Sequence, residues 1–542
     1  MSSPLDDLGE QKPREECGVF AVWAPEEEVA KLTFYGLFAL QHRGQEAAGI
    51  AVGDGQQTIV FKDLGLVNQV FDEQTLQAMQ GNVAIGHTRY STTGASTWEN
   101  AQPMFRSMGE DTGVALAHNG NLVNTTALLR RAIQLGIMSE NELDGCTSDT
   151  DIVASLLAHT AVKHGLEDAA LHLLPKVEGA YCFVMCDNDT IYAARDPYGV
   201  RPLSLGRLER GWVIASETCA LDIVGASYVR DIEPGEFVTI NASGVHSRHF
   251  AEPRHARCIF EHVYLARPDS YLNGHSVNST RVGIGRRLAK EHPCDGDLVI
   301  PVPESGMPAA VGYAQESGIP FAQGLTKNSY VGRTFIQPSQ TIRQLGIRLK
   351  LNPLREVIRG KRLVVVDDSI VRGNTQRALV SMLREAGAAE VHVRIASPPV
   401  KWPCFYGIDF ASPAELIANG VDDTDDMLEG VRRAIGADSL GYVSQEAMVE
   451  VTGQPACEMC CACFDGQYPI KLPPENPLVK PLLHMEGANC VVASDTEVPD
   501  DLLDLVADRE ERQHSNIAQH VARWIGLGTD RLQRLDRVTG RP

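Results

Sequence analysis

The chain has 542 residues, of which 43% are hydrophobic and 22% are charged, and this ordinary globular composition excludes a wholly disordered or collagen-like protein. Its 70 acidic residues outnumber its 49 Lys and Arg residues, and the net charge of -21 argues against nucleic acid as the main partner. The acidic excess still allows a local basic pocket for a phosphorylated small molecule.

The N-terminus and the cysteines indicate where in the cell the protein is found. No apolar run approaches the length of a membrane span, and residues 1–16 lack the apolar core of a secretory signal. We therefore expect a cytoplasmic protein without a membrane partner, whose 13 cysteines are reduced thiols. One cluster needs its own explanation, and it consists of Cys457, Cys460, Cys461 and Cys463.

Residues 17–250 follow the loose leader 1–16 and are rich in short apolar runs bounded by turn residues, which indicates a layered α+β domain. Strands are predicted at CGVFAVW, AAGIAVG, VAIGHTRYS, GVALAHNGNL, AYCFVMC, TIYAARD and WVIASE. Helices are predicted at LTFYGLFALQ and DIVASLLAHTAVKH.

A different pattern begins near residue 280, where uninterrupted apolar strands alternate with helices. The segments are STRVGIGRRLAKEH, DLVIPVPESG, RLVVVDDSIVRGNTQRALVSMLREAGA and VHVRIASPP. This alternation is typical of a buried parallel sheet. From residue 474 the chain is Pro-rich, then acidic, and we expect a partly disordered tail over 474–542.

Cys17 opens the first predicted strand, and several later segments make it a candidate nucleophile. A glutamine substrate needs one Arg for its α-carboxylate and one Asp for its α-ammonium, which Arg89 and Asp149 would supply. HNGNL (118–122) is expected to form a turn, where Asn119 and the Gly120 N–H would stabilise an oxyanion. If residues 1–16 are removed, the α-amine of Cys17, with an ordinary pKa of about 7.7–8.0, would accept the thiol proton.

With these segments in place, the chain resembles the amidophosphoribosyltransferase family from Cys17 to about residue 473. The matching segments are CGVF (17–20), LQHRGQEAAGI, GHTRYSTTG, HNGNL, TSDTD and RDPYGVRPL. The resemblance implies an N-terminal-nucleophile glutaminase domain over 17–250, an αββα sandwich released from a propeptide at 1–16. A type I phosphoribosyltransferase domain over 258–473 would follow.

The most specific motif is RLVVVDDSIVRGNT (362–375), in which a buried strand delivers Asp367 and Asp368 to a sheet edge. A loop from Ser369 to Thr375 would then bind a ribose 5-phosphate with its N–H groups before the next helix begins. The alternative is that the two aspartates only cap that helix. The loop resembles the type I phosphoribosyltransferase signature, and the binding residues expected within it are Ser369, Arg372, Gly373, Asn374 and Thr375.

Two further segments belong with this motif. The resemblance makes Ser305 in PVPESGMPAA a Mg²⁺ ligand beside Asp367 and Asp368. Residues 326–350 hold five basic residues and no acidic one. They form either a solvated basic face or a loop whose Lys327 and Arg333 close over pyrophosphate. Many relatives have Arg where Ser329 stands.

The remaining cysteines can make a four-thiolate site, because a C-x-x-C pair and two distant single cysteines suit zinc or an iron–sulfur cluster equally. Spacing alone cannot choose, and buried thiols without a ligand are the third alternative. Cys457/Cys460 and Cys460/Cys463 are overlapping pairs. The resemblance favours Cys460 and Cys463, and it implies one 4Fe-4S cluster per subunit on Cys258, Cys404, Cys460 and Cys463.

The resemblance thus implies a pentosyltransferase that hydrolyses glutamine at Cys17. It would transfer the ammonia to phosphoribosylpyrophosphate, giving 5-phosphoribosylamine, pyrophosphate and glutamate, the first committed step of purine synthesis. It also implies one Mg²⁺ per subunit, a homotetramer and inhibition by purine nucleotides. Two alternatives are another glutamine amidotransferase, such as glucosamine-6-phosphate synthase, and a regulator that keeps the phosphoribosyl fold as a ligand sensor. The first does not explain the Asp367-Asp368 loop, and the second does not explain the glutaminase residues.

Overall fold

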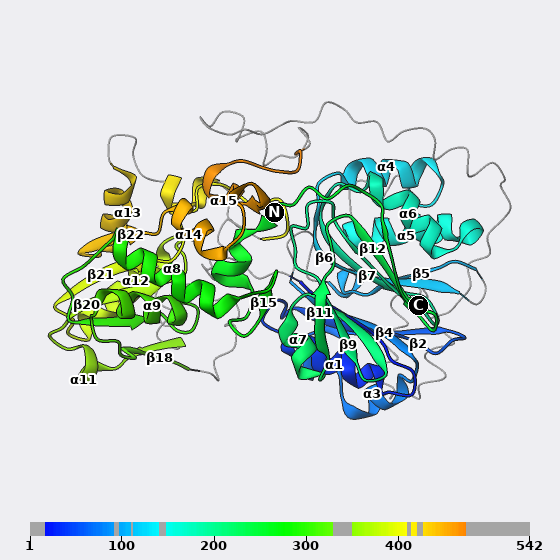
Figure 1. Cartoon of the computed structure of the whole chain (residues 1–542), viewed down its shortest axis with the longest axis horizontal. Coiled ribbons are helices and arrows are strands. Elements are labelled where there is room, and N and C mark those ends of the chain that lie inside the picture. The colour runs from blue at the N-terminus through cyan, green and yellow to red at the C-terminus, as the bar shows by residue number, and fades with distance from the viewer. Residues whose placement is uncertain are drawn as a thin grey trace, which may run out of the picture.

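The computed structural model describes residues 17–90, 97–109, 112–139, 148–328, 350–408, 413–419 and 426–472. They form two lobes, with the N-terminal unit in blue to green and the second unit in green to orange (Figure 1). The expectations for the leader 1–16, for Ser329 and Arg333, and for the tail 474–542 lie outside the described residues. No helix in the described part of the chain is both long and apolar enough to span a membrane.

The N-terminal unit contains two antiparallel sheets. The first has seven strands in the order β11 (Ser227–Asp231), β9 (Ser204–Leu208), β10 (Gly211–Ala215), β1 (Gly18–Trp23), β4 (Val83–Arg89), β2 (Ala47–Gly53) and β3 (Thr58–Leu64). The second has six strands in the order β13 (Gly244–His249), β12 (Glu236–Asn241), β8 (Ile191–Arg195), β7 (Gly179–Cys186), β6 (Gly113–Leu122) and β5 (Met104–Ser107).

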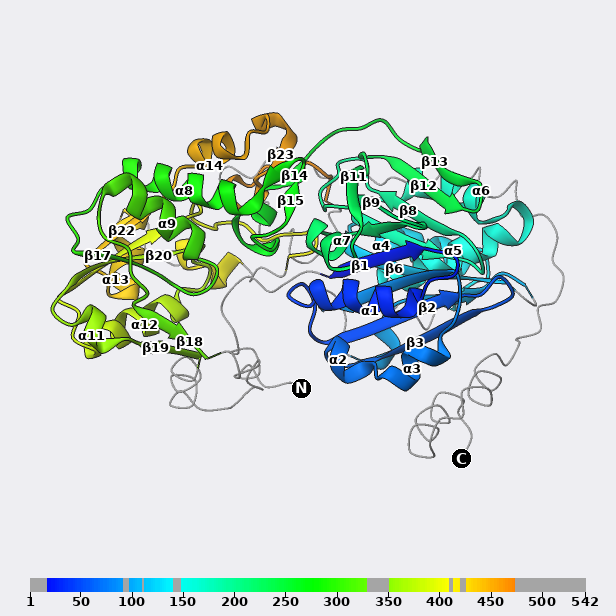
Figure 2. The ribbon, with the colours of Figure 1, turned by 60° about the horizontal axis from the view of Figure 1, so that its bottom comes forward.

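Helices cover the outer face of each sheet (Figure 2). The seven-stranded sheet carries α1 (Val29–Ala39), α2 (Val67–Val70), α3 (Glu73–Ala78) and α7 (Thr218–Ile223). The six-stranded sheet carries α4 (Thr125–Gln134), α5 (Asp149–His164) and α6 (Leu166–Leu173). Short 3₁₀ turns occur at η1 (Trp98–Asn100) and η3 (Leu174–Lys176).

The alternation along β1 shows why the layers form. Val19 and Ala21 point into the core between the two sheets, whereas Phe20 and Val22 pack with the helices outside. Because successive side chains of a strand face opposite sides, a strand that is apolar throughout needs cover on both faces. The predicted αββα sandwich is therefore confirmed.

The second unit is built on a parallel sheet in the order β17 (Leu298–Pro301), β20 (Arg362–Asp367), β21 (Glu390–Ile395) and β22 (Ser439–Tyr442). Helices α8 (Val277–Glu291) and α9 (Met307–Ser317) pack on one face, and α12 (Asn374–Glu385) and α13 (Met427–Ile435) pack on the other. This arrangement confirms the predicted parallel sheet flanked by helices.

Smaller elements complete this unit. Helix α14 (Gln445–Thr452) packs on α8, and α11 (Arg355–Ile358) and α15 (Ala462–Asp465) are single turns. Short strand pairs join β14 (Arg257–Cys258) to β23 (Met459–Cys460), β15 (Tyr271–Leu272) to β16 (His275–Ser276) and β18 (Leu325–Lys327) to β19 (Leu351–Pro353). The rest are the π-helical turn η4 (Glu261–Leu265) and the 3₁₀ turns η5 (Pro413–Glu415), η6 (Ile417–Asn419) and η7 (Ala456–Glu458).

Candidate active site

Cys17 precedes β1, a central strand of the seven-stranded sheet, and its side chain is partly buried. Its thiol lies 3.4 Å from the carbonyl oxygen of Tyr90. Gly18 pairs with Thr88 of β4, so Cys17 lies beside the end of that strand. Arg89 is the last residue of β4 and is buried. The sheet therefore brings the candidate nucleophile next to the guanidinium predicted to bind the glutamine carboxylate.

The strand predicted at GVALAHNGNL is confirmed as β6, and the turn predicted within it at Asn119 and Gly120 is wrong. They continue the register with β7, in which Gly120 lies opposite Tyr181. Glycine is needed here for another reason. Gly120 has φ of 142°, and a Cβ atom would lie 2.0 Å from the carbonyl oxygen of Ala180.

Asn119 is connected to the strand of the nucleophile through one hydroxyl group. Its amide donates a 3.4 Å hydrogen bond to Oγ of Ser216, and the same Oγ accepts a 2.9 Å bond from the N–H of Val19. Oδ1 of Asn119 and Nε2 of His118 are buried and have no hydrogen-bond partner among the described residues. Buried polar atoms are normally paired, so these two atoms suit a polar substrate.

Asp149 is the first residue of α5, as predicted, and its carboxylate accepts hydrogen bonds from the N–H of Leu122 (3.1 Å) and of Thr150 (2.8 Å). Nδ1 of His118 lies 3.5 Å away. Burial raises the pKa of Asp149, but His118 and these hydrogen bonds outweigh it and hold the pKa below the ordinary value. The carboxylate therefore stays ionised, as an ammonium-binding group requires.

Asp367 ends β20 at the carboxyl edge of the parallel sheet, and Asp368 follows it, as predicted. Both side chains are buried. The side chain of Gln376 donates to Asp367, and the Ser369 hydroxyl donates a 2.6 Å hydrogen bond to Asp368. Loop residue Gly373 has φ of 76°. Helix α12 begins at Asn374, so Asn374 and Thr375 lie in its first turn and not in the predicted loop.

The loop that carries Ser305 packs against the same strand end. The N–H of Val302 donates a 2.8 Å hydrogen bond to the carbonyl oxygen of Val366, and a Cβ atom on Gly306 would lie 2.4 Å from that oxygen. Ser305 is thereby brought to the edge where Asp367 lies. The close approach gives a physical reason for glycine at position 306.

Two other predicted phosphate-binding residues, Lys327 and Arg372, pair with carboxylates other than Asp367 and Asp368. Lys327 ends β18, and its Nζ lies 3.8 Å from a carboxylate oxygen of Glu304. Arg372 forms a 3.3 Å ion pair with Glu415. Neither contact reaches Asp367 or Asp368.

One residue near this site was missed by the sequence analysis. Arg281 is buried on α8 and donates to the carbonyl oxygens of His262 and Ala266, each at 2.8 Å. Burial lowers its pKa to about 10, against the opposing effect of the Asp368 carboxylate. Its segment, STRVGIGRRL, carries three arginines on one helix, and no pattern distinguishes the buried one.

Cys258, Cys404, Cys460 and Cys463 line one small cavity, although up to 205 residues separate them in sequence. The parallel pairing of β14 with β23 sets Cys258 opposite Cys460. Burial, reinforced by the neighbouring thiols, raises the pKa of Cys460 and Cys463 well above the ordinary value. Within the described ranges, no group of three or more His, Cys, Asp or Glu side chains forms a ready cage for a metal ion.

Two family models match the chain. A glutamine amidotransferase domain matches residues 87–222, and a phosphoribosyl transferase domain matches residues 282–397. The first range includes Arg89, Asn119 and Asp149, and the second includes Asp367 and Asp368.

Similarity to whole proteins covers nearly all of the chain. An amidophosphoribosyltransferase from Mycobacterium bovis is 68% identical over 503 residues, which is 92% of this chain and 95% of that relative. A solved structure described as the allosteric regulatory enzyme of purine biosynthesis matches with a TM-score of 0.79 and 44% identity, over 85% of this chain and 98% of its own. The glutamine phosphoribosylpyrophosphate amidotransferase of Bacillus subtilis, complexed with ADP and GMP, matches with a TM-score of 0.77 and 44% identity, over 84% and 98%.

Proposed function

The chain belongs to the amidophosphoribosyltransferase family, which carries out glutamine-dependent amidotransfer to phosphoribosylpyrophosphate in purine biosynthesis, and we propose that its chemistry is divided between Cys17 and the Asp367-Asp368 edge. The phosphoribosyl transferase match favours this family over glucosamine-6-phosphate synthase. The glutamine amidotransferase match disfavours a ligand sensor without catalytic activity.

In the glutaminase half-reaction, the Cys17 thiolate attacks the side-chain amide carbon of glutamine. Asn119 and the Gly120 N–H stabilise the oxyanion, while Arg89 and Asp149 hold the α-carboxylate and α-ammonium. The C–N bond breaks and ammonia leaves with a proton delivered from the Cys17 α-amine. Water then cleaves the thioester and releases glutamate. The partly buried Asp149 carboxylate, whose pKa is held below the ordinary value, supports its assignment.

In the second half-reaction, ammonia attacks C1 of phosphoribosylpyrophosphate as the bond to the pyrophosphate oxygen breaks. Pyrophosphate leaves with the electron pair and takes up the proton that the nitrogen loses. Asp367 and Asp368 orient the ribose hydroxyls, and the N–H groups before α12 bind the 5-phosphate. Ser305, Asp367 and Asp368 would hold Mg²⁺, whose contribution is charge neutralisation on the leaving pyrophosphate.

The observation that carries the proposal is that one chain contains two candidate sites: Cys17 beside Arg89, and Asp367-Asp368 at the edge of a parallel sheet. The test measures pyrophosphate release from phosphoribosylpyrophosphate with glutamine, with an ammonium salt, and with neither. We expect pyrophosphate release with glutamine and with the ammonium salt, and none when both nitrogen sources are omitted. Release with ammonium alone would reject the glutaminase assignment.

The mature chain is expected to begin at Cys17, because only a free N-terminal Cys17 has an α-amine next to its thiol. N-terminal sequencing of the active enzyme, together with its intact mass, measures this directly. A sequence that begins at Met1 or Ser2 in fully active protein would contradict the proposal.

We also propose a 4Fe-4S cluster on the four cavity cysteines. Its support is the donor set, since four thiols share one cavity. Burial raises the pKa of Cys460 and Cys463, and a bound cation would favour their thiolate forms. When bound, such a cluster would cross-link distant segments and supply no step of the reaction, because none of the four cysteines is among the residues assigned to either half-reaction.

Anaerobically purified protein is expected to be brown and to contain about four irons per chain. Cys460→Ser should abolish the iron content. Cys457→Ser is the matched control, because Cys457 is exposed and is not among the residues that line the cavity. A colourless, active preparation with one zinc per chain would favour the zinc alternative.

The proposal also includes inhibition by purine nucleotides and assembly into a homotetramer. The Bacillus subtilis relative is complexed with ADP and GMP, and this supports inhibition of the present enzyme by purine nucleotides. A homotetramer is proposed from the family alone, and the mass of the native enzyme in solution tests it.

A further inference from the structure

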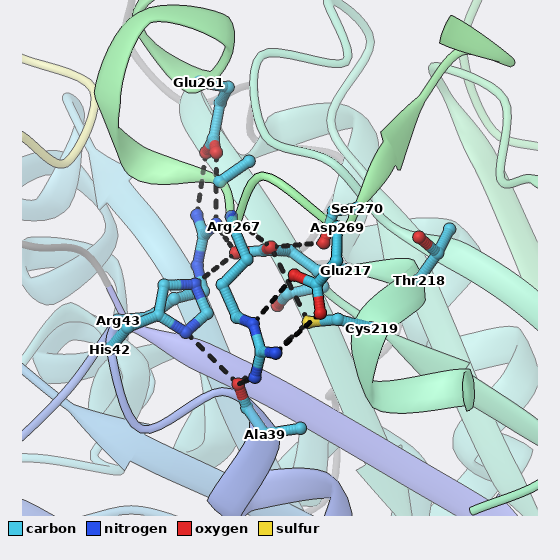
Figure 3. A network of polar contacts seen from close by, with 12 residues as sticks. Ala39, His42, Arg43, Glu217, Thr218, Cys219, Glu261, Arg267, Asp269 and Ser270 are labelled. Carbon is cyan, nitrogen blue, oxygen red and sulfur yellow. Dashed lines mark hydrogen bonds and ion pairs between the residues drawn. The ribbon is translucent and has the colours of Figure 1, made fainter. Parts of the chain in front are cut away.

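A buried network of charged side chains crosses the boundary between the two units (Figure 3). Arg43, which follows α1 in the N-terminal unit, donates to both carboxylate oxygens of Glu261, at 2.7 and 3.0 Å. Glu261 begins the π-helical turn η4 of the second unit. The side chains of both residues are no more than 3% exposed.

The same arginine holds the candidate nucleophile. Its Nε donates a 3.2 Å hydrogen bond to the carbonyl oxygen of Cys17. Its Nη1 also donates a 2.6 Å bond to Glu217, the residue before α7. The guanidinium therefore joins the main chain of Cys17 to one carboxylate from each unit, and its orientation depends on both.

Glu261 is itself fixed from two directions. Arg201 of the N-terminal unit lies 3.5 Å from its carboxylate and donates to the carbonyl oxygen of Tyr406 at 2.7 and 3.0 Å. On the other side, Arg281 binds the carbonyl oxygens of His262 and Ala266, within and just after η4. The turn that presents Glu261 is thus anchored to α8 of the phosphoribosyltransferase unit.

The charges balance within the network. Glu217 and Glu261 face Arg43 and Arg201, and all four side chains are buried. Burial raises the pKa of each glutamate, but His42 and Arg43 hold the pKa of Glu217 well below its ordinary value, and Arg43 and Arg201 hold that of Glu261 below its own. Neutralising Glu261 would deprive the buried Arg43 guanidinium of its bidentate partner.

We propose that Glu261 is a positioning residue for the glutaminase reaction: by clamping Arg43 from the second unit, it fixes the Cys17 main chain and so the direction of the Cys17 thiol. The proposal rests on Cys17 being the nucleophile. It means that the glutamine site is complete only when the phosphoribosyltransferase unit is docked against it. The carboxylate of Asp149 is held by the N–H groups of Leu122 and Thr150 and not by the clamp, so we expect its binding of the glutamine α-ammonium to be independent of Glu261.

The test is Glu261→Gln in the full-length enzyme, which keeps the side-chain volume and removes the charge. The kcat with glutamine is expected to fall about 100-fold, the scale that follows from misplacing a reacting atom by about 1 Å. The KM for glutamine and the rate with ammonium should be unchanged. This separation of kcat from KM would not result from general loss of structure.

The matched control is Glu236→Gln, which removes a bidentate, buried carboxylate of the N-terminal unit that binds Arg230 at 2.6 and 2.8 Å. It should keep the kcat with glutamine. Glu261→Asp keeps the charge but shortens the side chain by one methylene group. It replaces Glu261→Gln as the test variant if Glu261→Gln does not fold. The same separation of glutamine from ammonium rates is expected for it.

Two results would overturn the inference: an unchanged kcat with glutamine, or an equal fall in the rates with glutamine and with ammonium. Cys17→Ala is assayed in parallel. If Cys17→Ala keeps the glutamine-dependent rate, the proposed function is wrong. If Cys17→Ala loses that rate and the Glu261 variants keep it, only the role of Glu261 is wrong.

Discussion

Cys17→Ala is expected to lose the glutamine-dependent reaction by about 10⁴-fold or more, the scale on which removal of a covalent nucleophile acts. Ammonium-dependent synthesis should continue at the wild-type rate, because ammonia enters after the thioester step. The measurement is pyrophosphate release with each nitrogen source at saturating phosphoribosylpyrophosphate.

A matched control is available in the same unit. Cys186→Ala removes a sulfur atom from the fully buried core of β7, where the thiol has no part in the proposed reaction. Its expected effect is a modest loss of stability, with both rates retained. If Cys17→Ala lowered both rates equally, the glutaminase and transferase sites would not be separable as proposed.

Asp367→Asn and Asp368→Asn are expected to lower the rate with either nitrogen source by about 10²–10³-fold, since each removes a charge where the substrate and its metal are oriented. The folds should survive, because the Asn carbonyl oxygen can still accept the hydrogen bonds that Gln376 and Ser369 donate. Kinetics with ammonium alone give the cleanest measurement.

Asp297→Asn controls for removing an acidic side chain from the same sheet. Asp297 pairs with Arg362 at the amino end of β20, the edge opposite to the site, at 2.9 Å. Ligands of parallel sheets bind at the carboxyl edge, so this variant should keep its activity. If Asp367→Asn and Asp368→Asn matched it in turnover, the acidic pair would be structural.

The sequence predicted those parts of the fold whose local pattern is compatible with only one kind of secondary structure and environment. The run LVVVD is apolar on both faces, so it has to lie inside a covered parallel sheet, and β20 does. Strand β3 was missed because its burial is only partial and Lys62, Asp63 and Leu64 end it without a clear alternation. The Asn119-Gly120 dipeptide has the composition of a turn, but the close approach of β7 decides its conformation.

In the candidate site, too, features with a local sequence signal could be predicted, and features that depend on distant contacts could not. Asp149 could be predicted, because an acidic residue at a helix start is a local signal. The contact of Arg43 with Glu261 could not, since 218 residues separate them and neither lies in a pattern that requires the other. The four cysteines meet because of a tertiary pairing of β14 with β23, and their grouping came from the resemblance and not from spacing.

The pairing of β14 with β23 also has a consequence for biosynthesis on the ribosome. Residues 17–250 contain every strand of the glutaminase sandwich, so that unit can fold while the rest of the chain is still being translated. The cysteine cavity cannot form at that stage, because Cys258 and Cys404 leave the ribosome before Cys460 and Cys463 have been translated. Arg43 likewise lacks its ion pair until Glu261 has been translated. The nascent enzyme therefore acquires its two halves in a fixed order, and any metal centre at the cavity is loaded only near the end of synthesis.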